Sequence, residues 1–290
     1  MFRAKTTCLG LIAVCLLRTA LGGEENPSCN AVDRLGMAKA FEDQIIALHR
    51  AGQGIDMKVL ARQVDAASGR PIPLPEVPAV TGSFPAIYTN LCRSVLLVGA
   101  LVQCPNCKRL HGRPASGFVA APDGIVVTCC HVVTSSNALT LAAMDVDRKL
   151  YPVAEVLAAD RRKDIAILRV RGLDAPPLRF GAEHPVGADV WVISHPGYHF
   201  YLLTRGIVSD LFIEHVDGRP VNRMSVTADF GVGSSGAPVF DSRGEVVGVA
   251  VSTQPVKCEP GGSPPYVQMV IRQCLPAEDV VELLRGRRRD

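Results

Sequence analysis

The sequence lacks, near its start, a hydrophobic run of the roughly 20 residues that a membrane-spanning helix needs. The apolar run at residues 8–17 is shorter than this, and it follows the positively charged start MFRAK. This order is typical of a secretory signal peptide, with small residues at Ala20, Gly22 and Gly23 near the cleavage point. We therefore expect residues 1–23 to be a signal peptide and the protein to be exported, to the periplasm or the medium. An uncleaved N-terminal membrane anchor is the alternative.

The sequence also lacks a basic stretch with interleaved aromatic residues, and aromatic residues make up only 5% of it. Removal of residues 1–23 takes away three basic residues and no acidic one, which leaves 28 of each. The dense basic run at residues 285–289 is typical of a solvated tail. These features argue against a nucleic-acid partner.

A second C-x-x-C motif is absent as well, which bears on the motif CPNCKRLH. Its Cys104, Cys107 and His111 have the spacing of three zinc ligands, but a structural zinc site needs a fourth, for which Cys92 is the candidate. We favour a disulfide at a hairpin tip over zinc, because an exported chain with an even number of cysteines can form disulfides. No histidine directly follows Cys107, which excludes haem attachment, and we expect no cofactor. The pairing of the cysteines after residue 23 stays open; they are Cys29, Cys92, Cys104, Cys107, Cys129, Cys130, Cys258 and Cys274.

Helical periodicity is strongest before the main domain. Residues 31–65 carry apolar side chains at roughly helical spacing, which predicts a short helical segment. Five prolines at residues 68–85 then favour an extended linker. We therefore divide the chain into residues 1–23, a helical segment with its linker at 24–89, and a main domain at 90–290. The segment 24–89 fits a propeptide, an oligomerisation arm or a tether.

From residue 94 onward, short runs of Val, Ile, Leu and Phe alternate with turn residues, which predicts an all-β domain. About a dozen strands in under 200 residues fit one or two small closed barrels. The candidate strands are SVLLVGALVQ, ASGFVAAP, GIVVTC, ALTLAAM, IAILRV, DVWVIS, LTRGIVSD, SVTAD, APVFD, VVGVAVS and VQMVI. Residues 277–286 place acids early and a basic residue and glycine late, which predicts a C-terminal helix.

Three residues at the ends of apolar runs carry the groups of nucleophilic catalysis: His131 in VVTCCHVV, Asp164 in KDIAILRV and Ser235 in GVGSSGAPVF. A serine hydroxyl attacks a carbonyl at neutral pH only when an imidazole takes its proton and a carboxylate orients that imidazole. The order His, Asp, Ser excludes the α/β-hydrolase arrangement, in which the serine comes first. Asp160 is an alternative carboxylate, but the apolar strand directly follows Asp164.

The stretches around these residues resemble the trypsin/chymotrypsin-like peptidases, especially the HtrA (Deg) type and the related glutamyl endopeptidase-like group. SGFVAAPDGIVVTCCHVV is similar to the hairpin before the family's histidine, DIAILRV to its aspartate strand, and GSSGAPVFDSRGEVVGVAV to its nucleophile loop. The resemblance covers about residues 90–286 and implies a double six-stranded β-barrel. It also implies His131 as general base, Asp164 as its orienting carboxylate and Ser235 as nucleophile, with the N–H groups of Gly233 and Ser235 as oxyanion hole.

The resemblance extends to substrate binding. Asp229 lies six residues before Ser235, where trypsin carries the aspartate that selects Arg or Lys. The bacterial members of the family often carry an aspartate here as part of the loop and not of the pocket, which is the alternative. By the same resemblance, Ala250, Val251 and Ser252 would pair with the backbone of an extended substrate.

The sequence departs from the family pattern at three positions. Ser234 replaces the aspartate that pairs with a new N-terminus in trypsin-like zymogens, so activation by N-terminal insertion is not expected. Cys129 and Cys130 directly precede His131, and we expect them to be buried as small apolar residues. We expect no PDZ domain after residue 286, and therefore no PDZ-mediated partner.

The function predicted from these features is that of an exported, cofactor-independent serine endopeptidase that acts on polypeptide through an acyl-enzyme. The chain could also form a homo-oligomer. The alternative is a catalytically inactive trypsin-fold module that binds peptides, because Phe230 and Val232 make the loop before Ser235 unusually apolar.

Overall fold

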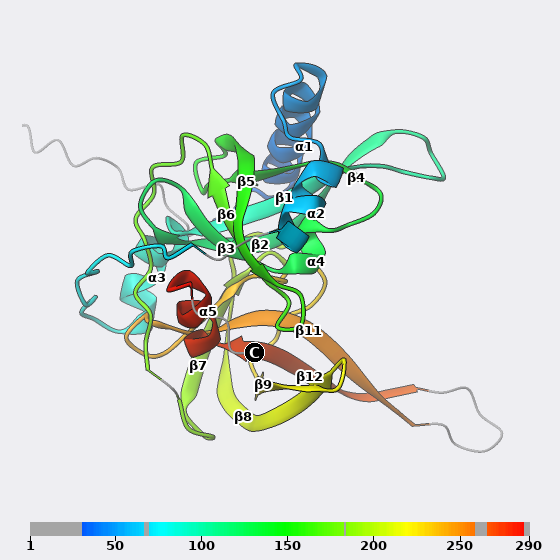
Figure 1. Ribbon diagram of the computed structural model, residues 1–290. Helices are drawn as coiled ribbons and strands as arrows, with labels where there is room; N and C mark the ends of the chain where they lie inside the picture. The colour runs from blue at the N-terminus through cyan, green and yellow to red at the C-terminus, as the bar shows by residue number, and fades with distance from the viewer. Residues whose placement is uncertain (1–30, 67–69, 183, 259–265, 287–290) are drawn as a thin grey trace, which may run out of the picture.

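The computed structural model describes residues 31–66, 70–182, 184–258 and 266–286 (Figure 1). The predicted signal peptide, Cys29 and the end of the basic run lie outside these residues. Within them, twelve strands form two closed antiparallel barrels of six strands each, followed by a C-terminal helix. This confirms the predicted all-β fold. None of the helices described is long and apolar enough to cross a membrane.

The first barrel comes from the chain between Val95 and Val170. In order around the barrel, its strands are β1 (Val95–Gln103), β2 (Leu110–Ala121), β3 (Ile125–Thr128), β6 (Ile165–Val170), β5 (Leu150–Asp160) and β4 (Ala138–Met144). Residues 95–101 of β1 are buried without alternation, because side chains on one face fill the barrel and helices cover the other face. Helix α1 (Arg34–Arg50) seats Phe41 over Gly99 and Gly112, where a Cβ atom would lie within 3 Å of the Phe41 ring.

The second barrel follows in the chain and lies below the first in Figure 1. Its strands, in order, are β10 (Pro238–Phe240), β11 (Val246–Cys258), β12 (Tyr266–Pro276), β9 (Arg219–Val226), β8 (Leu202–Val216) and β7 (Asp189–Ser194). Helix α5 (Ala277–Leu284) contacts β11 and β12 of this barrel and β5 of the other. Lys163 pairs there with Asp279, so α5 joins the two barrels.

Strand β11 extends beyond the barrel, together with β12, as a long hairpin (Figure 1). Strand β10 pairs only with residues 246–249 of β11. In the described part of the chain, the same edge of β11 is therefore unpaired from Val251 onward. An open strand edge of this kind can accept an extended peptide.

Most predicted strands coincide with observed ones, although the predicted strand at residues 225–229 shares only residues 225–226 with β9 (Arg219–Val226). Strand β5 was not indicated by the sequence pattern. This strand carries Pro152, Glu155 and Asp160, and its pairing with β6 shifts register twice. Each shift adds a residue to one strand and breaks the period-two alternation that marks a half-buried strand. Strands β8 and β11 are longer than predicted, because their outer halves are exposed and carry polar residues.

The predicted helical segment forms as two helices, α1 and α2 (Met57–Ala66). The chain reverses between them at Gly52, which has a φ of +65°, a conformation that glycine adopts without strain. Met37, Phe41 and Ile45 of α1 and the apolar face of α2 join the core of the first barrel. These helices are therefore packed parts of the domain.

A third helix, α3 (Phe84–Cys92), was not predicted and follows the proline-rich stretch, which has no regular structure where it is described. Pro85 stands at its N-terminal end, a position where the missing N–H costs no hydrogen bond. Phe84 stacks on Trp191 of β7 with the ring centroids 4.8 Å apart. Helix α3 thus joins the second barrel to β1 of the first.

Candidate active site

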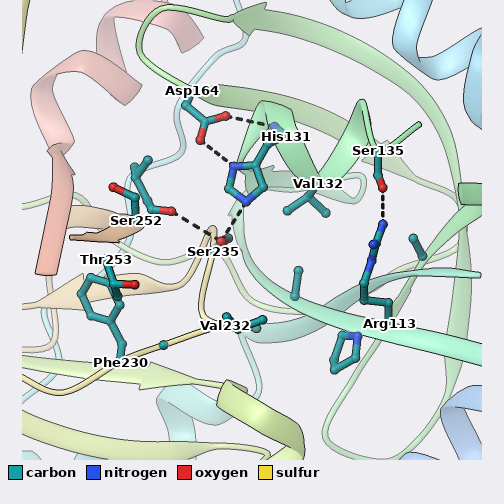
Figure 2. Close-up of a pocket in the computed structure, with 16 residues that line it drawn as sticks. Arg113, His131, Val132, Ser135, Asp164, Phe230, Val232, Ser235, Ser252 and Thr253 are labelled. Atoms are coloured by element: carbon teal, nitrogen blue, oxygen red, sulfur yellow. Dashed lines mark hydrogen bonds and ion pairs between the residues drawn. The ribbon is translucent and has the colours of Figure 1, made fainter. Parts of the chain in front are cut away.

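His131, Asp164 and Ser235 meet at the junction of the two barrels (Figure 2). His131 lies on the short helix α4 (Cys130–Val133), Asp164 lies in the turn before β6, and Ser235 lies in the loop between β9 and β10. The imidazole Nδ1 is 2.6 Å from Asp164 Oδ2, and its Nε2 is 2.9 Å from Ser235 Oγ. These distances allow a proton to pass from the hydroxyl to an imidazole that the carboxylate holds in place.

Asp164 holds His131 at two points. Its Oδ1 accepts a hydrogen bond from the backbone N–H of His131 at 2.9 Å, while Oδ2 faces Nδ1 of the ring. Asp164 has a φ of +61°, which aspartate tolerates better than most residues. The alternative carboxylate, Asp160, instead accepts hydrogen bonds from the N–H groups of Arg162 and Lys163 and stabilises the turn.

The loop before Ser235 has a defined backbone course. The carbonyl of Val232 accepts a hydrogen bond from Gly197 N–H at 2.9 Å, and the N–H of Gly233 points the opposite way because the peptide is trans. Gly233 has a φ of +102°, and a Cβ atom there would lie 2.5 Å from the carbonyl oxygen of His195. Among the residues described, the N–H groups of Gly233 and Ser235 donate to no protein acceptor. Both donors remain available for a ligand.

Ser116 of β2, which the sequence analysis did not single out, joins this loop to the first barrel. Its N–H donates to the carbonyl of Ser235 at 2.9 Å, and its Oγ donates to the carbonyl of Gly233 at 2.9 Å. The carbonyl of Ser116 accepts from Thr128 Oγ1 on β3, next to the strand end that carries His131. A lone serine in an apolar strand gives no sequence signal for this role, because the contacts are to residues more than 100 positions away.

His195 packs against the loop at Gly233 and is fully buried. The ring Nδ1 accepts a hydrogen bond from the backbone N–H of Tyr201, and the backbone N–H of His195 donates to Ser116 Oγ. Burial lowers the pKa of His195 to about 3, against the opposing effect of a hydrogen bond with the backbone of Leu96. The ring is therefore neutral at physiological pH.

Ser234 stands at the sequence position where trypsin-like zymogens carry an aspartate. It is buried, its Oγ donates to Ser194 Oγ at 2.9 Å, and it accepts a hydrogen bond from Gly231 N–H. The loop is thus held by neutral hydrogen bonds at this position.

Cys129 and Cys130 are both buried beside His131. Desolvation, with a further contribution from the Asp164 charge, raises the pKa of Cys130 to about 12 and that of Cys129 well above its usual value. The thiol of Cys130 donates to the carbonyl of Ile165 at 2.9 Å. Because their pKa values are raised, both side chains pack as small, protonated groups. A reactive cysteine needs a lowered pKa, so neither has the properties of one.

The three residues open onto a pocket of about 460 Å³ (Figure 2). Its lining is mostly apolar and includes the ionisable side chains of Arg113, His131 and Asp164. The other lining residues are Ala100, Pro114, Ala115, Val132, Ser135, Phe230, Gly231, Val232, Gly233, Ser235, Val251, Ser252 and Thr253.

The structure separates the four residues expected to bind substrate. Val251 and Ser252 line the pocket. Asp229 does not; its side chain is 74% exposed and forms an ion pair with Arg272. Ala250 is buried, and its N–H and carbonyl already bond to Ala237 and Gly236. Arg113, a pocket residue absent from the sequence analysis, bonds to Ser135 and Asn137.

Cys104, Cys107 and His111 lie together at the turn between β1 and β2, outside the pocket lining. Cys92 is buried at the end of α3 and is not a member of this cluster of three. Both cysteines of the turn are free thiols in the structure.

Comparison with known proteins shows what this arrangement is similar to. Residues 115–249 match the family model of the trypsin-like peptidase domain, and this range contains His131, Asp164 and Ser235. The part of the chain that carries these three residues is therefore similar to a trypsin-like peptidase domain.

Among curated proteins, the chain is similar to "Serine protease MT3772" of Mycobacterium tuberculosis, with 37% identity over 154 residues. It is also similar to a "Probable periplasmic serine endoprotease DegP-like" of Pseudomonas fluorescens, with 29% identity over 136 residues. These matches cover 50% and 46% of this chain but only 37% and 28% of the relatives, so the chain matches about a third of their length.

Two solved protease structures are also similar to this chain. The active form of the Rv3671c protease from M. tuberculosis superposes with a TM-score of 0.53 and 26% identity, covering 75% of this chain and 94% of that one. The HtrA-type protease AlgWS227A with a decapeptide superposes with a TM-score of 0.55 at 15% identity, covering 69% of this chain and 65% of that one. At that identity, the second likeness shows the fold alone.

The buried His195 predicts a pH dependence of stability. The unfolded chain binds a proton on this imidazole below about pH 6.5, whereas the folded chain does so only near pH 3, so stability is lost as the pH falls between these values. In a Ser235→Ala background, we expect the free energy of unfolding to fall by up to about 1.4 kcal/mol per pH unit from pH 6 to 5. His195→Asn should reduce this slope, as measured by urea denaturation.

The exposed His215 on β8 provides the matched control, since His215→Asn should keep the parent slope. Equal slopes for both variants, or an imidazole NMR signal from His195 that titrates near pH 6, would contradict the prediction.

Proposed function

We propose that this domain is a serine endopeptidase that cleaves peptide bonds through an acyl-enzyme, with Ser235 as nucleophile, His131 as general base and acid, and Asp164 as orienting carboxylate. The observation that carries the proposal is the continuous relay from Ser235 Oγ to His131 at 2.9 Å and from His131 to Asp164 at 2.6 Å. The similarity to proteins named serine proteases supports it.

The proposed reaction begins when Ser235 Oγ attacks the carbonyl carbon and its proton passes to Nε2 of His131. The negative oxygen of the tetrahedral intermediate accepts hydrogen bonds from the N–H groups of Gly233 and Ser235. His131 then gives its proton to the leaving amine, and the C–N bond breaks. A water molecule attacks the acyl-enzyme by the same route and restores the Ser235 hydroxyl. Asp164 stays ionised throughout and stabilises the imidazolium.

The substrate in this proposal is an extended polypeptide that pairs with the open edge of β11. Val251 and Ser252 lie on this edge and in the pocket, and the carbonyl of Val251 is 3.4 Å from Ser235 Oγ. Backbone pairing at this edge would place the scissile bond beside the nucleophile.

For the residue before the scissile bond, we propose an apolar side chain. Asp229 pairs with Arg272 in the solvent and does not line the pocket, so its carboxylate has no basic substrate side chain to neutralise. Phe230, Val232 and Val251 instead present apolar surface. A charged side chain there would lose hydration without gaining a partner.

The N-terminal segment has a structural role in this proposal. Helix α2 contacts α4, which carries His131, and Gln63 of α2 accepts a hydrogen bond from Val156 N–H of β5. Leu60 and Val64 are buried in the core of the first barrel. We infer that α1 and α2 support the histidine and are not a removable propeptide, which keeps them with the domain that the sequence suggested to begin near residue 90.

Export is the remaining part of the proposal. It rests on the sequence pattern of residues 1–23 and on relatives whose names include the word periplasmic.

The first test is labelling with a fluorophosphonate, which reacts only with an activated serine. We expect one adduct, on Ser235, and its loss in Ser235→Ala. Because the relay acts as a unit, peptide hydrolysis should fall about 10⁶-fold in kcat for Ser235→Ala and about 10⁴-fold for Asp164→Asn.

Ser242→Ala, at an exposed turn serine, controls for the labelling and should leave adduct and activity unchanged. A folded protein that acquires no adduct would argue against catalysis and favour the inactive peptide-binding module.

The second test concerns the oxyanion donors. Gly233→Ala places a methyl group against the carbonyl of His195 and should turn the Gly233 N–H away, lowering kcat by about 100- to 1,000-fold. Gly187→Ala is the matched control, because Gly187 also has a positive φ, +91°, but faces open space. Comparable kcat values for both variants would mean that Gly233 N–H has no catalytic part.

The third test concerns specificity. Profiling with a peptide library should show an apolar residue before the cleaved bond, and Asp229→Asn should leave this profile unchanged. Phe230→Ala should alter which apolar side chains are accepted. A preference for Arg or Lys that Asp229→Asn removes would refute the apolar assignment.

A further inference from the structure

The turn between β1 and β2 has the backbone of a metal-binding loop. Lys108 N–H donates to the carbonyl of Cys104 at 3.0 Å, and Cys107 N–H points to the sulfur of Cys104 at 3.5 Å. Lys108 adopts a φ of +59°, which closes the turn tightly after the second cysteine.

His111, the second residue of β2, adds a third ligand. Its Nε2 is 3.0 Å from Cys107 Sγ, and the ligand atoms of Cys104, Cys107 and His111 all lie within 4.8 Å of one another. A zinc ion with a sulfur at 2.3 Å and a nitrogen at 2.1 Å in tetrahedral geometry needs these two atoms about 3.6 Å apart. The three side chains therefore need only a small adjustment to share one ion.

Glu42 of α1 faces the His111 ring. Its Oε2 is 3.6 Å from His111 Nδ1 and accepts a hydrogen bond from Gly112 N–H at 3.2 Å. A carboxylate facing Nδ1 favours the tautomer that carries its proton there, which directs the lone pair of Nε2 toward the two sulfurs. Metal-binding histidines are commonly held by a carboxylate in this way.

We propose that Cys104, Cys107 and His111 form a zinc site, with Glu42 as the positioning residue and a water or an outside ligand at the fourth position. The two thiols lose their protons when the ion binds. Soft sulfur ligands together with one imidazole select zinc over the hard ions magnesium and calcium. The proposal takes the place of the disulfide that the spacing favoured, because Cys107 Sγ lies 3.0 Å from His111 Nε2.

The proposed ion would join three parts of the domain. Cys104 and Cys107 belong to the turn, and Glu42, which faces His111, belongs to α1. His111 belongs to β2, and Arg113, two residues further along this strand, lines the active-site pocket. Metal binding should therefore stabilise the packing of α1 on the barrel.

The test uses the full chain carrying Ser235→Ala, reduced with a phosphine, stripped with a chelator and titrated with Co²⁺. We expect one equivalent to bind, with the visible absorption of tetrahedral cobalt and a thiolate charge-transfer band, and Zn²⁺ to displace it. Cys104→Ser, Cys107→Ser and His111→Asn should each abolish this spectrum. Glu42→Gln should keep it and weaken affinity about 10- to 100-fold.

Cys258→Ser is the matched control, because Cys258 is a partly exposed thiol outside the cluster, and it should bind Co²⁺ like the parent. Absence of binding by the reduced protein would overturn the proposal, as would a cobalt spectrum that survives in the Cys104→Ser, Cys107→Ser double variant. A disulfide between these cysteines that forms in air despite excess Zn²⁺ would also overturn it. None of these readouts depends on peptidase activity.

Discussion

The hydrogen bonds of Ser116 hold the two barrels in register at the active site. Its N–H and Oγ bind the carbonyls of Ser235 and Gly233, and its own carbonyl binds Thr128 next to the His131 strand end. Ser116, Thr128 and Gly233 are buried, and an unmet buried backbone carbonyl costs roughly 1–3 kcal/mol. The barrels cannot slide against each other without breaking several of these bonds at once. The position of Ser235 relative to His131 is therefore fixed by the hydrogen bonds that hold the Ser235 loop against β2.

Burial keeps most titratable groups around this junction uncharged. The thiols of Cys129 and Cys130 stay protonated, and the ring of His195 stays neutral. Asp164 is then the charge that faces His131. The imidazole of His131 is half exposed, so solvent partly screens the effect of the Asp164 charge on a developing imidazolium.

The sequence allowed the prediction of the two barrels and of the residues that meet at their junction. Runs such as ALTLAAM and IAILRV coincide with β4 and β6, because apolar runs bounded by turn residues depend on local chemistry alone. Strand β5 escaped notice because its two register shifts are set by its partner strand. Helix α3 was not predicted, because prolines precede it and because it packs against Trp191, a distant residue of the second barrel.

The same distinction holds for the site. His131, Asp164 and Ser235 each stand in a recognisable local motif, whereas Ser116 and His195 act through contacts with distant residues. Asp229 shows how little spacing alone determines, since its distance from Ser235 along the chain suggested a pocket residue, whereas its side chain is mostly exposed and pairs with Arg272. Sequence spacing gives the order of groups along the chain, and only the course of the loop determines where they point.

The nucleophile and its base come from different barrels, and the chain completes the first barrel at Val170, 65 residues before Ser235 is reached. During synthesis, a chain whose first barrel has folded carries His131 and Asp164 but no hydroxyl to activate. The second barrel must also close, with α5 docked against β5, before the loop at Gly233 is held. On the proposed mechanism, hydrolytic capacity therefore requires both barrels to be complete.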